Sequence, residues 1–156
     1  MKTVLLFFSD IHLTGKKPEN EGAVINAFCE DAKQQLANLQ YNDAYVLIGG
    51  DLVQAADDNK SYQAFYDNIL SKLITNGIPA ENIICVPGNH DCQRQWVADN
   101  KEIYASVVNQ RFTEDRFNNM INGQQGNLFI EKFANYKYFI EKYMPNSKQN
   151  LVGFPI

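Results

Sequence analysis

Three short apolar runs alternate with two longer segments of helical periodicity in the N-terminal part of the chain. The runs are TVLLFF (Thr3–Phe8), AYVLI (Ala44–Ile48) and NIICV (Asn82–Val86). Continuous apolar runs of this length are typical of strands that are buried on both faces of a parallel sheet. We therefore expect three strands in a sheet that is covered on both faces.

The segments between these runs repeat apolar residues at the i, i+3, i+4 spacing of an amphipathic helix. The first helix is expected over Val24–Leu39, with Asn20 or Glu21 at its start. The second is expected over about Lys60–Asn76, and Gly77 ends it. Alternating strands and helices predict an α/β fold built on a right-handed, parallel βαβαβ unit.

Beyond Cys92 the pattern becomes helical. Helices are expected over Trp96–Phe117 and, after the turn NGQQGN, over Leu128–Met144. The apolar end Leu151–Ile156 is expected to form an edge strand. We expect a single domain over residues 1–156, with the βαβαβ core in 1–92 and the helical segment in 93–150, because a chain of 156 residues fits one hydrophobic core.

Charge and cysteine content narrow the functional classes. The net charge is −4, which argues against a broad phosphate-tracking surface for nucleic acid. Cys29, Cys85 and Cys92 are an odd number without CxxC spacing, so a disulfide framework is not expected. The apolar run Val4–Phe8 is too short for a signal peptide or a membrane span. We expect a cytoplasmic protein without a membrane partner.

Each of the three predicted strands is followed by side chains that bind metals. These are Asp10 and His12 after the first strand, Asp51 after the second, and Asn89, His90 and Asp91 after the third. Because ligands of open α/β sheets bind beyond the carboxyl ends of the strands, we expect these residues to converge. Carboxylate, imidazole and amide groups suit manganese, iron or zinc. The sequence therefore predicts a metal cluster.

The spacing also suggests how the ligands are shared. Asp10 and His12 are two residues apart, so in extended backbone they face the same way and bind one ion together. Asp51 has two carboxylate oxygens and is able to bridge two ions, and Asn89 offers a carbonyl oxygen to the second.

The third loop carries one of only two histidines in the chain. His90 follows Asn89 directly, and the carboxylate of Asp91 is expected to orient its imidazole. We predict that His90 donates a proton and that Asp91 supports it.

The motifs D-x-H in SDIH, G-D in GGDLV and G-N-H-D in PGNHD occur in this order. Together they resemble the calcineurin-like metallophosphoesterase superfamily over roughly Met1–Cys92. The resemblance implies a layered α/β sandwich and two-metal hydrolysis of a phosphodiester or phosphomonoester. In that family a metal-bridging hydroxide attacks phosphorus while both ions neutralise the developing charge.

The resemblance also implies a role for each matched residue. Asp10 and His12 hold the first ion, Asp51 bridges, Asn89 binds the second ion, His90 protonates the leaving oxygen, and Asp91 supports His90. The expected cofactors are two divalent ions of manganese, iron or zinc.

The chain departs from the family in one respect. The family takes further histidines from its C-terminal half, a single one and a G-H-x-H pair, and no histidine follows His90 here. We therefore expect a second metal site that is open and weak. We also expect the chain to be the N-terminal part of a longer protein, whose remainder supplies those ligands and a second sheet.

One feature of the sequence bears on the branch of the family. The stretch GDLVQAADD lacks the acid-arginine-glycine continuation of calcineurin-type phosphatases, which favours the phosphodiesterase and nuclease branches. The expected substrate is a phosphoester, with a nucleotide or a nucleic acid among the options. Two alternatives stay open: a non-catalytic regulatory or interaction module that keeps the fold, and a nuclease domain of a DNA-processing or defence assembly.

Overall fold

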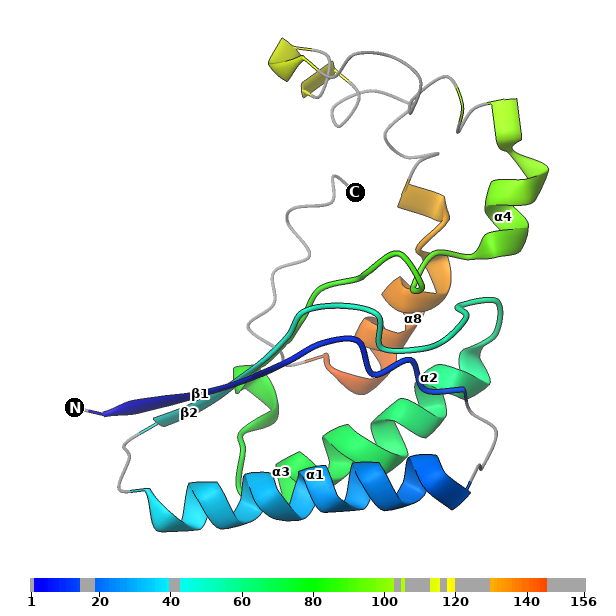
Figure 1. The fold of residues 1–156 in the computed structure, drawn as a ribbon. Coiled ribbons are helices and arrows are strands. Elements are labelled where there is room, and N and C mark those ends of the chain that lie inside the picture. Colours follow the sequence, from blue (N-terminus) through cyan, green and yellow to red (C-terminus); the bar gives the residue numbers. More distant parts are fainter. Residues whose placement is uncertain are drawn as a thin grey trace.

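The structure is a computed structural model that describes residues 2–14, 19–39, 43–102, 105, 113–115, 118–119 and 130–145. Its centre is a parallel sheet with the order β1-β2-β3 (Figure 1). The strands are β1 (Thr3–Phe8), β2 (Asp43–Ile48) and β3 (Ile83–Cys85). The predicted α/β fold with a parallel βαβαβ unit is confirmed.

Both predicted crossover helices are present. Helix α1 (Glu19–Asn38) connects β1 to β2 and begins one residue before the predicted Asn20. The second crossover runs through α2 (Asn59–Phe65), the π-helix η1 (Tyr66–Leu70) and α3 (Ser71–Thr75). A short 3-10 helix, η2 (Ala80–Asn82), then leads into β3.

Local interactions determine where the second crossover begins and ends. The Asp58 carboxylate caps α2, because it accepts hydrogen bonds from the backbone N–H groups of Lys60 and Ser61. At the other end Gly77 has a φ of 101°, a conformation that glycine adopts without a steric penalty. Gly77 is therefore the helix stop that the sequence predicts.

After β3, the structure gives full bounds for the helices α4 (Arg94–Asp99) and α8 (Ala134–Tyr143). Helix α4 ends at Asp99 and covers the start of the helix predicted over Trp96–Phe117. Residues 101, 102, 105, 114 and 115 are also helical, and most of the remaining prediction lies outside the described residues. Helix α8 begins later than predicted because Lys132 and Phe133 form a turn. The NGQQGN turn and the predicted edge strand at 151–156 lie outside the described residues.

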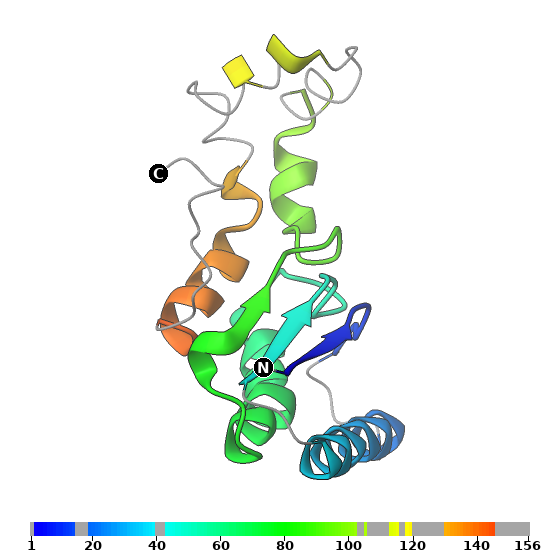
Figure 2. The same cartoon turned by 90° about the vertical axis from the view of Figure 1, so that its left-hand side faces the viewer.

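Helices α1, α2 and α3 lie against the same face of the sheet (Figures 1 and 2). The two crossovers advance in the same direction, from β1 to β2 to β3, so right-handed connections place both on one face. The strand residues of that face belong to the hydrophobic core, including Val46 and Ile48, which are fully buried.

The described residues leave the other face of β1 open, so the expectation of a sheet that is buried on both faces stays a prediction. Leu5 and Phe7 on β1 are each 60% exposed. The burial of β1 and β2 alternates along each strand, as in a sheet that is covered on one side. An apolar run indicates a strand but does not reveal what packs on each face.

Helix α8 extends the core beside β3 and α2. The Tyr136 hydroxyl donates a hydrogen bond to the Cys85 carbonyl at 2.7 Å, and the rings of Phe139 and Tyr62 stack with centroids 5.1 Å apart. These contacts attach the C-terminal helical segment to the strand that leads into the G-N-H-D loop. None of the helices described is long and apolar enough to cross a membrane.

Candidate metal centre

The loops that follow β1 and β2 stay paired after the strands end. The backbone N–H of Asp10 donates to the Gly50 carbonyl at 3.1 Å, and the N–H of His12 donates to the Asp51 carbonyl at 2.9 Å. A parallel bridge between Leu13 and Val53 continues this pairing. The D-x-H and G-D motifs are therefore held next to each other by backbone hydrogen bonds.

Three of the predicted ligands have left-handed backbone conformations. The φ angles are 59° for Asp10, 50° for His12 and 53° for Asp51, and within the described residues no other non-glycine residue has a positive φ. Such a conformation costs about 1–3 kcal/mol for a residue with a side chain and tends to occur at functional sites. The strain is concentrated on the residues that the sequence singles out for metal binding.

Two glycines allow the G-D and G-N-H-D loops to approach each other. A Cβ on Gly50 would lie 2.7 Å from the backbone nitrogen of Gly88, and a Cβ on Gly88 would lie 2.2 Å from Asp51 Oδ1. Neither distance is compatible with a side chain. The glycines of both motifs thus bring the third loop against the Asp51 carboxylate.

Asp51 connects the other two loops. Its Oδ1 accepts a hydrogen bond from the His90 backbone N–H at 2.8 Å, and its Oδ2 lies 3.8 Å from His12 Nε2. His12 Nε2 is also 3.8 Å from Asp10 Oδ1. The D-x-H pair and the G-D acid converge as predicted.

The spacing of these atoms fits a metal ion. Two atoms that each lie about 2.1 Å from one ion are at most about 4.2 Å apart, so both 3.8 Å pairs are compatible with a shared ion. His12, Asp51 and His90 form a second grouping, with one ligand atom from each within 4.8 Å of one another. The rings of His12 and His90 meet edge to face at 4.4 Å. The geometry therefore adds His90 as a candidate ligand, which sequence reasoning treated only as an acid.

One nitrogen at the centre lacks a partner. Nδ1 of His12 is buried and makes no hydrogen bond to the described residues. Buried polar atoms are almost always hydrogen-bonded, so each exception needs an explanation. Since Nε2 is the nitrogen that faces Asp10 and Asp51, the unpartnered Nδ1 does not itself mark the metal position.

The imidazole of His90 is oriented by a backbone carbonyl. Its Nδ1 lies 2.9 Å from the Gln54 carbonyl oxygen and 3.2 Å from Arg94 Nη2, and the tautomer with the proton on Nδ1 donates to that carbonyl. Arg94 Nη2 donates to the same oxygen at 3.2 Å. In that tautomer the Gln54 carbonyl accepts from Nδ1, and Nε2 of His90 is the ring nitrogen that is left to exchange a proton or bind a metal.

Asp91 does not orient His90 in this structure, contrary to the sequence-based expectation. Its Oδ2 accepts from the backbone N–H groups of Gly88 at 2.9 Å and Leu52 at 3.3 Å, and its Oδ1 accepts from the Tyr62 hydroxyl at 3.1 Å. The side chain is fully buried, and burial raises the pKa of its carboxyl. Asp91 is a buried anchor that ties both loops to α2.

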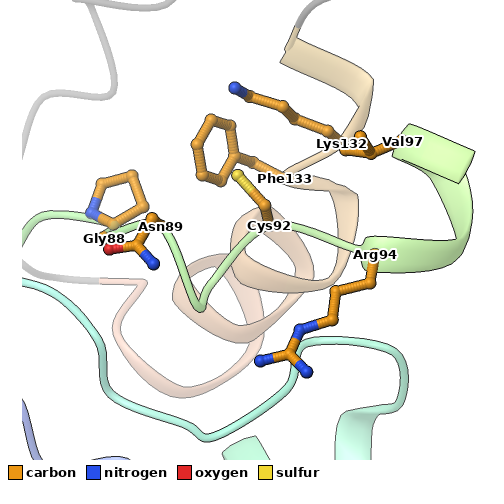
Figure 3. Close-up of a pocket in the computed structure, with 8 residues that line it drawn as sticks. Gly88, Asn89, Cys92, Arg94, Val97, Lys132 and Phe133 are labelled. Carbon is orange, nitrogen blue, oxygen red and sulfur yellow. The ribbon is translucent and has the colours of Figure 1, made fainter. Parts of the chain in front are cut away.

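Asn89 lies on the outer side of the same loop. Its side chain is exposed and lines a cavity of about 450 Å³ between the loop, α4 and the turn before α8 (Figure 3). Its role as a ligand of a second ion stays a prediction. The other residues that line the cavity are Pro87, Gly88, Cys92, Arg94, Val97, Lys132 and Phe133.

Sequence reasoning did not identify Gln54, Tyr62 or Lys132 as part of this region. Gln54 acts through its carbonyl and Tyr62 lies in the middle of an apolar helical stripe, so neither carries a motif. Lys132 is distant in sequence but its carbonyl accepts from the Gln93 N–H at 2.7 Å. The pKa of the Lys132 ammonium is lowered, because burial disfavours its charge more than the neighbouring Cys92 favours it.

The family whose profile matches the chain is described as Calcineurin-like phosphoesterase, and the match spans residues 3–151. The chain belongs to the calcineurin-like phosphoesterase family. Comparison with curated proteins and with solved structures gave no match. Membership of a calcineurin-like phosphoesterase family implies divalent metal ions, and the cluster of His12, Asp51 and His90 is where the structure offers ligands for one.

Proposed function

We propose that this protein hydrolyses phosphoesters with two divalent metal ions bound at the carboxyl ends of β1, β2 and β3. The observation that carries the proposal is the position of the Asp51 carboxylate, which contacts the D-x-H loop with one oxygen and the G-N-H-D loop with the other. A carboxylate so placed is suited to bridge two ions. The family match supports phosphoester chemistry.

Different residues of the chain are proposed to bind each of the two ions. Asp10, His12 and Asp51 would hold the first ion, and Asp51 and Asn89 would hold the second, which would have fewer ligands. When bound, the ions polarise the phosphoryl oxygens and lower the pKa of water. The backbone pairing of the loops keeps the ligands in place before a metal arrives, which limits the reorganisation that binding requires.

His90 supplies the proton for the leaving oxygen in this proposal. Its Nδ1–H is engaged by the Gln54 carbonyl, so Nε2 is the nitrogen that delivers the proton. Arg94 lies beside it, with Nη2 3.2 Å from His90 Nδ1, and adds positive charge next to the imidazole.

The test is hydrolysis of bis(p-nitrophenyl) phosphate by the purified protein with added Mn²⁺. Wild-type protein is expected to turn over the substrate, and Asp51→Asn is expected to abolish turnover. Asp31→Asn is the matched control because Asp31 lies on α1, where its Oδ1 accepts a side-chain hydrogen bond from Gln35. Equal activity of the wild-type protein and Asp51→Asn would contradict the site assignment.

A further inference from the structure

The imidazole of His90 is held by residues 54–57, which follow β2 and are called the 54–57 loop below. His90 Nδ1 lies 2.9 Å from the Gln54 carbonyl oxygen, and the Gln54 N–H donates to the Leu13 carbonyl at 3.0 Å. A carbonyl that accepts from a ring nitrogen sets the orientation of the ring. The orientation of His90 therefore depends on where the 54–57 loop holds its carbonyl groups.

The helices after β3 contact this loop at two points. Asn135 on α8 donates from Nδ2 to the Ala56 carbonyl at 2.7 Å, across 79 residues of sequence. The Gln95 N–H on α4 donates to Asp57 Oδ1 at a longer distance, 3.4 Å. Asn135 thus makes the shorter contact, and it makes that contact with the backbone of the loop.

The hydrogen bond of Asn135 is not needed to attach α8 to the core. Tyr136, Phe139 and Ile140 on this helix are all buried, and the Tyr136 hydroxyl donates to the Cys85 carbonyl at 2.7 Å. Burial of three large side chains stabilises the position of a helix far more than one hydrogen bond of a half-buried side chain. The 54–57 loop, which has no such apolar anchor on α8, depends more on this bond than the helix does.

The Ala56 carbonyl lies two residues after the Gln54 carbonyl. Peptide groups are rigid planes, so a shift of the Ala56 peptide is passed to its neighbours through the few intervening φ and ψ angles. Displacement of the Gln54 carbonyl would remove the acceptor of the His90 Nδ1–H and allow the imidazole to rotate or to carry its proton on Nε2. A displacement of about 1 Å is able to cost about 10²-fold in rate, even where its cause lies far from the chemistry.

We propose that Asn135 is a positioning residue for His90, which acts through the Ala56 carbonyl to hold the Gln54 carbonyl against the imidazole. The effect on catalysis rests on the proposed function, in which His90 donates a proton, whereas the orientation of the ring needs neither metal nor substrate. The proposal gives α8, which carries none of the three motifs, a part in the geometry of the site.

The first test is spectroscopic and uses metal-free protein in EDTA. Long-range ¹H–¹⁵N correlation spectra at about pH 8.5, where an ordinary imidazole is neutral, report which ring nitrogen carries the proton. The signals of His90 are identified by their absence in His90→Ala, because the chain has only two histidines. We expect the Nδ1–H tautomer of His90 to dominate in wild-type protein and its share to decrease about twofold or more in Asn135→Leu.

Asn68→Leu is the matched control. Asn68 Nδ2 also donates to an alanine carbonyl, that of Ala64, at 2.7 Å, but it does so within the second crossover. This variant should leave the His90 signals unchanged. If Asn135→Leu does not fold, Asn135→Asp replaces it, since the aspartate has the same shape and its carboxylate has no N–H to donate.

The second test is kinetic and uses Mn²⁺-loaded protein. Asn135→Leu should lower kcat for a dinucleoside phosphate about 10–10²-fold, and that for bis(p-nitrophenyl) phosphate by less than about threefold, because p-nitrophenolate departs without a proton. In a His90→Ala background, Asn135→Leu should cause no further decrease, since a residue that acts through His90 has nothing left to position.

His90 signals that are the same in wild-type protein, Asn135→Leu and Asn135→Asp would overturn the proposal. A decrease of the same size in the wild-type and His90→Ala backgrounds would also overturn it, because Asn135 would then act independently of His90. A protein that hydrolyses neither substrate, but whose His90 signals change in Asn135→Leu, would refute the phosphoesterase and support the positioning contact.

Discussion

The two oxygens of the Asp51 carboxylate contact different loops: Oδ1 accepts a hydrogen bond from the His90 N–H at 2.8 Å, and Oδ2 lies 3.8 Å from His12 Nε2. One side chain therefore couples the D-x-H and G-N-H-D motifs, which are far apart in the sequence. Any change that moves Asp51 is expected to disturb both.

Gly88→Ala is expected to displace Asp51, because the new Cβ would lie 2.2 Å from its Oδ1 and 2.5 Å from its backbone nitrogen. We expect a loss of about 1–3 kcal/mol in the free energy of unfolding, together with weaker metal binding. Urea denaturation and Mn²⁺ titration measure the two effects. Gly22→Ala is the control: its new Cβ would have no atom within 4 Å, and the substitution in the interior of α1 should stabilise the protein by about 0.5–1 kcal/mol.

Tyr62→Phe removes the hydroxyl that donates to the buried Asp91 carboxylate. We expect a decrease of about 1–3 kcal/mol in the free energy of unfolding, because a buried acceptor loses a partner. Tyr138→Phe, at a position 45% exposed on α8, should stay within about 0.5 kcal/mol of wild type. Equal denaturation midpoints for both variants would show that Asp91 is not an anchor.

The stability of the protein is expected to fall at alkaline pH through Cys85. Burial raises the pKa of this thiol, so the unfolded chain releases the proton at lower pH than the folded one. The contribution is fully present below the unfolded pKa of about 8.5 and decreases by up to about 1.4 kcal/mol per pH unit above it.

Denaturation of wild-type protein and Cys85→Ala at pH 7.5 and pH 10 tests this effect. Between those pH values, wild-type protein should lose about 2 kcal/mol more than the variant. The same pH dependence in both proteins would mean that the Cys85 thiol does not stay protonated in the folded state.

The proposed role of His90 depends on the leaving group. His90→Ala is expected to reduce hydrolysis of a dinucleoside phosphate about 10²–10⁴-fold, because an alkoxide needs protonation as it departs. Hydrolysis of bis(p-nitrophenyl) phosphate should decrease less, since p-nitrophenolate departs without a proton. Steady-state rates of wild-type protein and His90→Ala, measured with both substrates, show whether the decrease differs between the two leaving groups. If both decrease equally, His90 acts mainly as a metal ligand, as its proximity to His12 and Asp51 also permits.

The sequence predicts the strands and crossover helices well because their periodicity is local. Thr3–Phe8 is a strand with the predicted bounds, and Gly77 ends the second crossover. The exposure of Leu5 and Phe7 was not predictable, because the packing on the faces of a sheet depends on tertiary contacts. The same holds for α8, whose start depends on the turn at Lys132 and Phe133.

The ligand loops could be predicted from the order of strands and motifs, whereas their supporting contacts could not. Sequence adjacency implied that Asp91 orients His90, yet neighbouring residues in a loop point in different directions. Asp91 enters the core, and His90 is instead held by the Gln54 carbonyl. A backbone carbonyl has no signature in the amino-acid sequence.

The most direct test of the account is the number of metal ions that the protein binds. Titration of metal-free protein with Mn²⁺, followed by electron paramagnetic resonance of the free ion, should show one tight site and one weaker site. Asp51→Asn should abolish the tight site and Asp31→Asn should retain it. Binding of Mn²⁺ that is identical in wild-type protein and in Asp51→Asn would contradict the central claim.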